Sequence, residues 1–343
     1  MTGLHAIVIV AMGAMLAAAC VWAEAAESSG GRRAVRIARF RGDRKAAISF
    51  TFDDAMADHV ALAVPLLEEF GYRGTFYLVT GWIKRDAKAD PVPESAGKDR
   101  PADARPSWEE WKELAARGHE IGNHSTTHAK LTDVKGEAAL EQEIIASERL
   151  IAEKIGRAPL SFSYPYCASN PQIKAMTLRC HALDRGRFPG YGDKDFTAAG
   201  VNHYIDEAIE KGMWHVALVH GVCRADEWRK HLAWVKEREG NLWVGTYADV
   251  GRYVRERDAA TLEVVSRAAS SVTFTLMLPP DLRPDWFNVP LTVVVEAGPG
   301  ASSPAATRQG PGRAPAVRAA DGKLLADVEP GPDRVTVTWK TAK

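Results

Sequence analysis

Cysteine is scarce in this chain, with 4 residues among 343, and no two of them form a C-x-x-C pair. This absence argues against a zinc site built from cysteine thiolates. Net charge is also lacking, because 44 Lys and Arg residues balance 44 Asp and Glu residues. The balance gives no electrostatic reason to expect nucleic acid or an anionic membrane as a partner, so a neutral substrate suits this chain.

No Lys or Arg precedes the long apolar run at residues 4–22. The alanine-rich residues 23–26 follow the run, and the combination is typical of a cleaved export signal. We therefore expect a signal peptide at residues 1–25 and an exported protein, either periplasmic or secreted. The length of the run also permits an uncleaved N-terminal membrane anchor. Cys20 matches a lipoprotein signal only imperfectly, because Leu16 stands one place too far from it.

The length of the chain favours one large domain and a smaller one. Residues 26–44 lack periodicity, so we expect a flexible linker there and ordered structure from about Lys45. Residues 45–257 alternate between strand-like and helix-like segments, a pattern that predicts parallel strands joined by helices, in a barrel or an open sheet. Residues 258–343 contain short β-branched runs between Pro and Gly clusters, which predict a small β-sandwich-like domain. The charged, Pro-rich residues 84–106 are expected to form a surface insertion near the site.

Two adjacent carboxylates, Asp53 and Asp54, follow the strand-like residues 46–52. Their mutual repulsion is costly unless a cation or a shared proton relieves it. Carboxyl ends of parallel strands meet on one face of such folds, where functional sites lie. By itself, an Asp-Asp pair is more often a solvated turn that caps the next helix.

A pair of histidines, His124 and His128, changes this interpretation. If residues 124–128 form a helical turn, an i, i+4 spacing points both imidazoles the same way. Together with Asp54 they supply two nitrogens and one oxygen, the three-ligand pattern of catalytic zinc that leaves one position open. Without the carboxylate, such a histidine pair is weak evidence, because surface helices carry it by chance.

Two further segments end predicted strands. Tyr166 follows a rigid proline, where a backbone N–H can face a developing oxyanion. His220 ends an apolar strand, in the sequence Leu218-Val219-His220. Taken alone, the first is an ordinary strand end and the second a core or rim histidine.

In this order, TFDD (51–54), HSTTH (124–128), the Pro-Tyr segment and Leu-x-His resemble the polysaccharide deacetylases of the NodB-like family, carbohydrate esterase family 4. The likeness spans about residues 45–250. It implies a deformed (β/α)7 barrel that removes acetyl groups from N- or O-acetylated sugars. It also implies a divalent metal, most often Zn²⁺, bound by Asp54, His124 and His128.

The resemblance assigns the proton transfers as well. Asp53 is implied to be the general base for the attacking water, and His220 the acid that protonates the leaving amine or alkoxide. The backbone N–H of Tyr166 is implied to line the oxyanion site.

The chain departs from the family pattern in two places. Many relatives carry an arginine two places before the proline, where it steadies the base, but this chain has Ser163 there. Arg185 is our candidate substitute for this missing arginine as the partner of Asp53, although it can also be interpreted as a surface arginine. The acidic-Trp segment that orients the catalytic histidine is not recognisable, and Asp184 is the candidate orienting group for His220.

We considered three functions. The first is a deacetylase of acetylated polysaccharides or oligosaccharides, acting on carbon–nitrogen bonds other than peptide bonds or on acetyl esters. The second is a noncatalytic carbohydrate-binding relative, which the intact set of motif residues disfavours. The third is a small-amide hydrolase on the same fold, which the export signal disfavours.

The β domain is expected either to bind sugar through Trp286 or Trp339 or, as the preferred alternative, to brace the barrel. Three cysteines remain after signal removal and allow one disulfide among three pairings, Cys167 with Cys223 among them.

Overall fold

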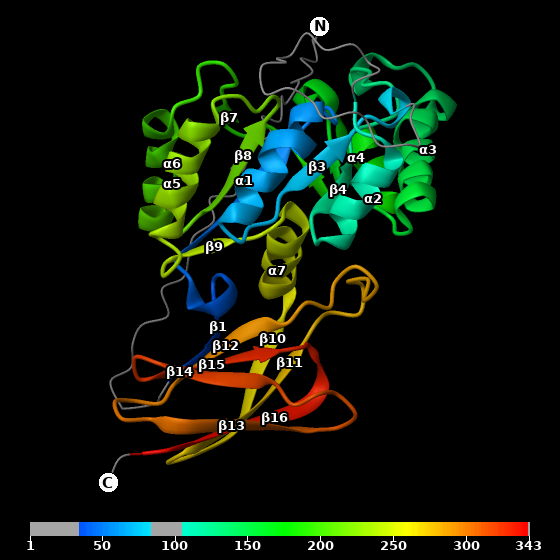
Figure 1. Cartoon of the computed structure of the whole chain (residues 1–343). Helices are drawn as coiled ribbons and strands as arrows, with labels where there is room; N and C mark the ends of the chain where they lie inside the picture. The colour runs from blue at the N-terminus through cyan, green and yellow to red at the C-terminus, as the bar shows by residue number, and fades with distance from the viewer. Residues whose placement is uncertain (1–33, 84–104, 342–343) are drawn as a thin grey trace, which may run out of the picture. The chain divides into compact units, whose positions relative to one another are not determined.

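The computed structural model describes residues 34–83 and 105–341 (Figure 1). The predicted signal peptide and nearly all of the predicted insertion at 84–106 lie outside these ranges. Within them, no helix is both long enough and apolar enough to cross a membrane.

A parallel sheet forms the centre of the α/β part of the chain (Figure 1). Seven strands follow one another in the order β6-β5-β4-β3-β2-β8-β7, and β9 also pairs with β2. All of these pairs are parallel, so the carboxyl ends of the strands lie along one edge. The predicted α/β class with a deformed (β/α)7 barrel is confirmed. The strands are β2 (Ala46–Phe52), β3 (Thr75–Leu78), β4 (Glu120–Asn123), β5 (Ser161–Ser163), β6 (Leu183–Arg185), β7 (Gly190–Tyr191), β8 (Trp214–Val219) and β9 (Leu242–Val244).

Strand β2 is buried at every residue, as expected for a strand in the middle of a parallel sheet covered on both faces. The rings of Phe52 and Phe76 stack with their centroids 4.9 Å apart, and Phe50 meets Trp228 edge-on at 6.3 Å. The Thr51 hydroxyl donates to the Ala217 carbonyl on β8 at 2.7 Å. These contacts fix the position at which β2 ends and the two aspartates begin.

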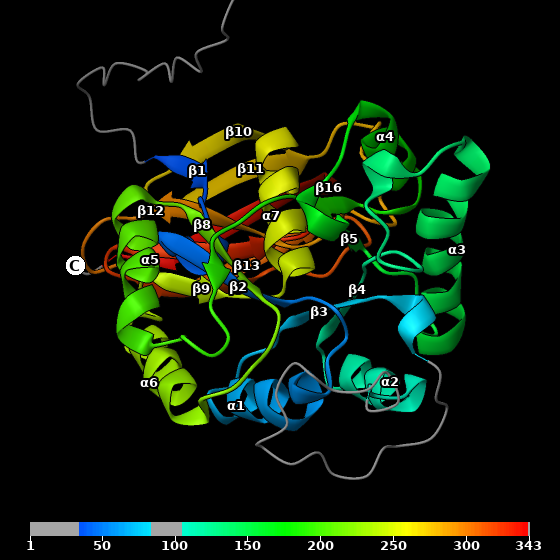
Figure 2. The ribbon, with the colours of Figure 1, turned by 90° about the horizontal axis from the view of Figure 1, so that it is seen from above.

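Helices surround the curved sheet (Figure 2). Ser107 and Glu110 form a capping box at the start of α2. Gly156 ends α3 in a left-handed conformation with φ 88°, which glycine adopts at little cost. The α-helices are α1 (Val64–Glu69), α2 (Trp108–Ala116), α3 (Glu137–Ile155), α4 (Pro171–Cys180), α5 (Ala198–Lys211), α6 (Ala225–Lys236) and α7 (Tyr247–Ala259). Short helices are η1 (Arg41–Asp43), the π-helix η2 (His59–Ala63), η3 (Thr80–Trp82), η5 (Leu131–Asp133) and η6 (Pro165–Cys167).

The β part consists of two antiparallel four-stranded sheets, in the orders β1-β12-β15-β14 and β10-β11-β16-β13. Burial alternates along β11, because one face of the strand meets the shared apolar core. That this part is a separate domain with its boundary at 257/258 stays a prediction. Its strands are β1 (Val35–Ile37), β10 (Thr261–Ala268), β11 (Ser271–Met277), β12 (Leu291–Glu296), β13 (Ser302–Gln309), β14 (Ala316–Ala320), β15 (Lys323–Val328) and β16 (Gly331–Lys340).

The expectation of a flexible linker up to residue 44 is wrong for its last part. Residues 35–37 form β1, which pairs antiparallel with β12 more than 250 residues later in the chain. Three residues are too few to produce a visible period in the sequence, and the partner strand that stabilises them is distant. Ordered structure therefore begins before Lys45.

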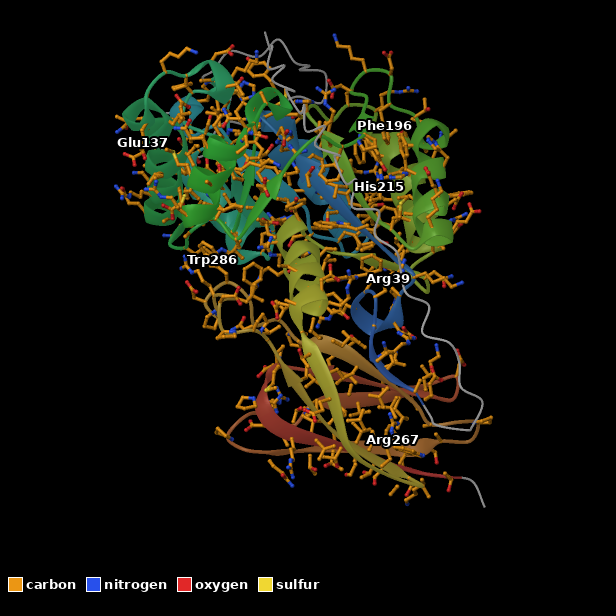
Figure 3. The ribbon with its side chains drawn as sticks, turned by 180° about the vertical axis from the view of Figure 1, so that it is seen from behind. Arg39, Glu137, Phe196, His215, Arg267 and Trp286 are labelled. Atoms are coloured by element: carbon orange, nitrogen blue, oxygen red, sulfur yellow. The ribbon has the colours of Figure 1, made fainter. Side chains whose placement is uncertain are left out.

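Two tryptophans of the β part serve packing. Trp339 is buried in the core between the sheets. Trp286 lies in the loop between β11 and β12 (Figure 3), where the Arg283 guanidinium covers its ring at 3.6 Å and its carbonyl accepts a hydrogen bond from Arg252 of α7. These contacts favour the bracing alternative over sugar binding.

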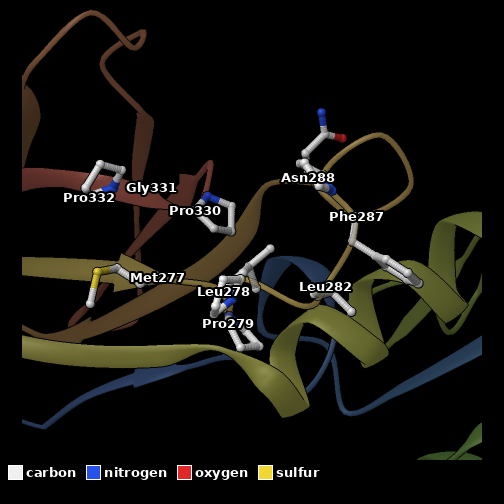
Figure 4. A pocket seen from close by; sticks show the side chains of 11 residues that line it. Met277, Leu278, Pro279, Leu282, Phe287, Asn288, Pro330, Gly331 and Pro332 are labelled. Atoms are coloured by element: carbon white, nitrogen blue, oxygen red, sulfur yellow. The ribbon is translucent and has the colours of Figure 1, made fainter.

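A pocket of about 320 Å³ lies beside this loop (Figure 4). Its walls are mostly proline and other apolar side chains, including Met277, Leu282 and Phe287, with the amide of Asn288. The lining holds no histidine and no carboxylate, so it offers neither metal ligands nor proton-transfer groups.

Helix α7 connects the two parts through buried polar contacts. The Tyr253 hydroxyl donates to the Ala38 carbonyl at 3.0 Å. Glu256 is fully buried and accepts a hydrogen bond from the Val289 N–H at 3.0 Å. Burial raises the pKa of Glu256 to about 7, although the Val289 hydrogen bond and the charge of Arg252 act in the opposite direction.

We predict that Glu256→Gln becomes increasingly stabilising relative to the natural chain as pH rises from about 4.5 to 7. A raised folded-state pKa means that the protonated carboxyl stabilises the fold below the unfolded-state value and that this contribution is lost as pH rises through the folded-state value. Glutamine keeps the acceptor for Val289 and does not ionise. Thermal unfolding of both proteins across this pH range measures the effect, and a pH-independent difference would contradict it.

Candidate metal and catalytic site

Asp53 and Asp54 lie at the carboxyl end of β2, as the sequence predicts. The Asp53 N–H donates to the Val219 carbonyl at 2.9 Å, which continues the pairing of β2 with β8. Asp54 and Ala55 then adopt left-handed backbone conformations, with φ 77° and 49°. Such values are costly for residues other than glycine and are concentrated at functional sites. The sharp turn separates the directions of the two neighbouring carboxylates.

His124 follows β4 and is buried. Its Nδ1 lies 2.7 Å from the Ser163 carbonyl oxygen. Because a carbonyl only accepts hydrogen bonds, Nδ1 carries the proton and Nε2 keeps its lone pair. Nε2 lies 3.6 Å from Asp54 Oδ1.

His128 reaches the same carboxylate by a different route from the one expected. Residues 124–128 form no helical turn; Ser125 and His128 have φ values of 70° and 63°. The His128 N–H donates to the Ser125 hydroxyl at 3.0 Å, and this irregular loop brings the two imidazole centroids to 4.8 Å. His128 Nε2 lies 3.3 Å from Asp54 Oδ1.

Glu143 of α3 stabilises this loop, a role that the sequence did not reveal. One of its oxygens accepts from the N–H groups of Thr126 and Thr127 at 3.1 and 2.9 Å, and the other accepts from the Thr127 hydroxyl at 2.7 Å. A carboxylate that satisfies the loop backbone replaces the helical hydrogen bonds, so the loop keeps its shape without being a helix.

The three predicted metal ligands fit a divalent cation. Ligand atoms of Asp54, His124 and His128 lie within 4.8 Å of one another. Asp54 Oδ1 is buried without a hydrogen-bond donor in the described structure, and a cation would satisfy it. Burial and the neighbouring His124 lower the pKa of His128, which favours the neutral form that binds metals.

Arg185 meets Asp53, as the substitution hypothesis requires. The guanidinium is 1% exposed; its Nη2 contacts Asp53 Oδ2 and donates to the Ser163 hydroxyl at 2.6 Å. Ser163 and Arg185 are direct partners in the β5–β6 pair. The small serine leaves room for an arginine that arrives from the neighbouring strand.

The environment of Asp53 keeps it ionised. Burial raises the pKa of this carboxyl, but the charges of Arg185, His124 and His220 lower it more, and the result lies below the usual value. The Arg185 guanidinium also lies over the Tyr77 ring, 4.9 Å from its centroid, which gives a desolvated cation a further favourable contact.

His220 directly follows β8 on the same edge of the sheet, but the prediction of Asp184 as its partner is wrong. Asp184 precedes Arg185 on β6, and successive side chains on a strand point to opposite faces. Asp184 accepts a hydrogen bond from the Tyr164 hydroxyl at 3.1 Å instead. Asp193 instead contacts the residue that follows His220, because its Oδ1 accepts from the Gly221 N–H at 2.9 Å.

The signal that points to Asp193 is weak. No tryptophan stands within three residues after it, and Phe196 at the third position stacks its ring on Trp228 with the centroids 4.3 Å apart.

Tyr166 lies at the edge of the ligand cluster. It has φ 58°, its side chain is 63% exposed, and its ring centroid lies 4.8 Å from that of His128. On the other side, the Trp82 centroid lies 5.2 Å from His128. Arg105 covers Trp82 at 4.3 Å and donates to the Asp54 carbonyl. No sequence signal marked Trp82 or Arg105.

The cysteines form no disulfide within residues 34–83 and 105–341. Cys167, Cys180 and Cys223 all carry thiols, and Cys223 Sγ donates to the Asp193 carbonyl at 2.8 Å. None of the three pairings that the sequence permits is therefore formed in this part of the chain.

Comparison with known proteins identifies the family. Residues 41–181 match the family model of the polysaccharide deacetylases. A chitooligosaccharide deacetylase from Rhizobium leguminosarum bv. trifolii is 25% identical over 182 residues, which cover 52% of this chain and 74% of that protein. The chain thus contains a domain of the polysaccharide deacetylase family, as the motifs indicated.

Another curated protein matches over a longer stretch of sequence, and solved structures match as well. A gellan lyase from Bacillus sp is 25% identical over 346 residues, which cover 88% of this chain but 13% of that protein. A peptidoglycan deacetylase from Bacillus subtilis has 19% identity and a TM-score of 0.43, and covers 62% of this chain and 94% of that one. A family 4 carbohydrate esterase from Streptomyces lividans has 18% identity and a TM-score of 0.42, and covers 59% and 93%.

We predict that Arg185→Met destabilises the metal-free protein by about 3–5 kcal/mol, because it leaves a buried carboxylate without its partner. Adding Asp53→Asn to this variant should recover most of the loss, since the amide carries no charge. Urea unfolding in the presence of a chelator measures both effects. If Arg185→Met alone were as stable as the natural chain, the ion pair would contribute nothing to the free energy of unfolding.

We also predict that His128→Ala lowers Zn²⁺ affinity by more than about 100-fold, because even groups that only support metal ligands are worth 10–100-fold. His203→Ala, at an exposed histidine of α5, is the control and should bind Zn²⁺ normally. Calorimetric titration of the metal-free proteins gives the affinities. Unchanged binding in His128→Ala would remove this residue from the ligand set.

Proposed function

We propose that this protein is a metal-dependent hydrolase that removes acetyl groups from a carbohydrate polymer or oligosaccharide. The observation that carries the proposal is the meeting of an ionised carboxylate, three metal-ligating side chains and a histidine at the carboxyl edge of one parallel sheet. The family match over residues 41–181 supports the reaction class.

Asp54, His124 and His128 would hold a divalent cation, which we propose to be Zn²⁺. Two imidazoles and one carboxylate form a ligand set that suits Zn²⁺ and leaves a coordination position open. When bound, the cation would supply positive charge that acidifies water and polarises the acetyl carbonyl.

Asp53 is the proposed general base. Its depressed pKa keeps it ready to accept a proton near neutral pH, and Arg185 holds one of its oxygens in place. The other oxygen, Oδ1, is buried and accepts no hydrogen bond in the described structure. That atom is the proposed proton acceptor for the attacking water, because the contact with Arg185 occupies the other.

His220 is the proposed acid. It follows β8, the strand that pairs with β2, so it lies beside the end of β2 that carries Asp53. At this place its charge contributes to the low pKa of Asp53. A protonated imidazole there would give its proton to the departing amine or alkoxide. The Tyr166 N–H would donate to the oxyanion that develops on the acetyl carbonyl.

The proposed partner is an acetylated polysaccharide or oligosaccharide outside the cytoplasm, in keeping with the apolar N-terminal run and the zero net charge. A noncatalytic sugar-binding role is disfavoured because the base, the three ligands and the acid are all present and near one another. A small-amide hydrolase remains the alternative reaction, distinguished by its acceptance of acetamides that lack a sugar.

We predict that Asp53→Asn releases acetate at least about 100-fold more slowly while keeping its metal, because a positioned base contributes roughly 10²–10⁴-fold. Asp184→Asn is the matched control, since this carboxylate lies on the opposite face of β6. Acetate release from acetylated oligosaccharides and metal content by mass spectrometry are the measurements. Full activity in Asp53→Asn would rule it out as the base.

A further inference from the structure

Three consecutive backbone groups beyond β8 are each held by a side chain from elsewhere in the fold. We call residues 220–222 the acid loop. The His220 carbonyl lies 2.5 Å from His59 Nε2, the Gly221 N–H donates to Asp193 at 2.9 Å, and the Val222 N–H donates to Asp58 Oδ2 at 2.8 Å. A loop with every one of these groups occupied has little freedom to move the His220 side chain.

His59 connects this loop to the turn that carries the base. It is fully buried, and its Nδ1 accepts a hydrogen bond from the Met56 N–H at 3.2 Å. An Nδ1 that accepts has no proton, so Nε2 carries the proton and donates it to the His220 carbonyl. Both ring nitrogens of a neutral imidazole therefore form hydrogen bonds, Nδ1 with the Met56 N–H and Nε2 with the His220 carbonyl. Burial lowers the pKa of His59 despite the neighbouring Asp58, which agrees with the neutral form.

The local backbone is built for these contacts. His59 begins the π-helix η2 (His59–Ala63), a wider turn that is found frequently at functional sites. Asp58 and His59 are adjacent in sequence, and both reach the acid loop. Gly221 makes room for them, because a Cβ at this position would lie 3.3 Å from Asp58 Oδ2 and 3.6 Å from the Asp193 carboxyl carbon.

We propose that His59 is a positioning residue that fixes His220 relative to Asp53. Met56 stands three residues after the proposed base, and the carbonyl that His59 binds belongs to the proposed acid. One imidazole thus sets the separation between the two proton-transfer groups. The inference rests on the proposed function for its catalytic consequence, but the hydrogen-bond bridge stands on the geometry alone.

The test compares two substitutions at this position. Asn carries its amide near the place of Nδ1 and cannot reach the His220 carbonyl, whereas the longer Gln places its amide N–H near the place of Nε2. The control is His231→Asn, which removes an equally buried imidazole between α6 and the sheet.

Two substrates separate positioning of the acid from general damage. An acetylated oligosaccharide needs a proton on its leaving group, but 4-nitrophenyl acetate does not, because nitrophenolate leaves unprotonated. We expect His59→Asn to lower kcat on the oligosaccharide by about tenfold or more, since misplaced acid catalysis forfeits part of a roughly 10²–10⁴-fold term. KM and the rate on 4-nitrophenyl acetate should change less than about twofold, and His59→Gln should recover part of the loss.

Hydrogen exchange gives a readout that does not depend on activity. Peptides that cover residues 220–222 should exchange faster in His59→Asn than in the natural chain or in His231→Asn, with His59→Gln in between. Unchanged exchange in that segment would overturn the bridge itself. Equal losses on both substrates would overturn its role in positioning the acid. If the natural chain released no acetate while exchange still rose in His59→Asn, the proposed function would fail and the bridge would survive.

Discussion

The contact between Asp53 and Arg185 depends on the curvature of the whole sheet. Asp53 follows β2 and Arg185 ends β6, two strands with β3, β4 and β5 between them in the sheet order. A flat sheet would hold these strand ends apart by several strand spacings of about 4.8 Å each. Curling brings them together in the interior, where burying two charges is costly unless they are paired and hydrogen-bonded. The buried pair is therefore possible only in a strongly curved sheet, and it keeps the proposed base ionised and fixed in position.

The remaining groups of the site take their positions from this arrangement. Asp54 turns away from Asp53 through a left-handed backbone, and His124 and His128 approach it from the loop beyond β4. His220 comes from β8, whose ladder with β2 continues as far as the Asp53 N–H. The carboxyl ends of neighbouring parallel strands thus place the proposed base, the proposed ligand set and the proposed acid along one edge of the sheet.

Much of this was predictable from the sequence, because the informative patterns are local. The alternation of strand-like and helix-like segments predicted the parallel α/β class, and the capping box at Ser107 and the stop at Gly156 are features of neighbouring residues. The motif residues lie at strand ends, so their convergence followed from the class of fold. The role of Arg185 was predictable as a substitution, since the serine at 163 removed the usual partner of the base.

What could not be predicted depends on contacts between distant segments. Strand β1 is stable only because β12 accepts it, and the loop between His124 and His128 is shaped by Glu143 from a later helix. Asp184 was chosen as the partner of His220 because the sequence pattern alone could not show which face of β6 points inward. His59 carries no motif at all; only the positions of Met56 and His220 on either side reveal what it does.

The most direct test of the account is acetate release from a mixture of acetylated polysaccharides by the purified mature chain, measured before chelation, after chelation and after Zn²⁺ is restored. The account predicts release that stops on chelation and returns with Zn²⁺. Release that continues in the metal-free protein, or no release from any acetylated polymer by protein loaded with Zn²⁺, would contradict it.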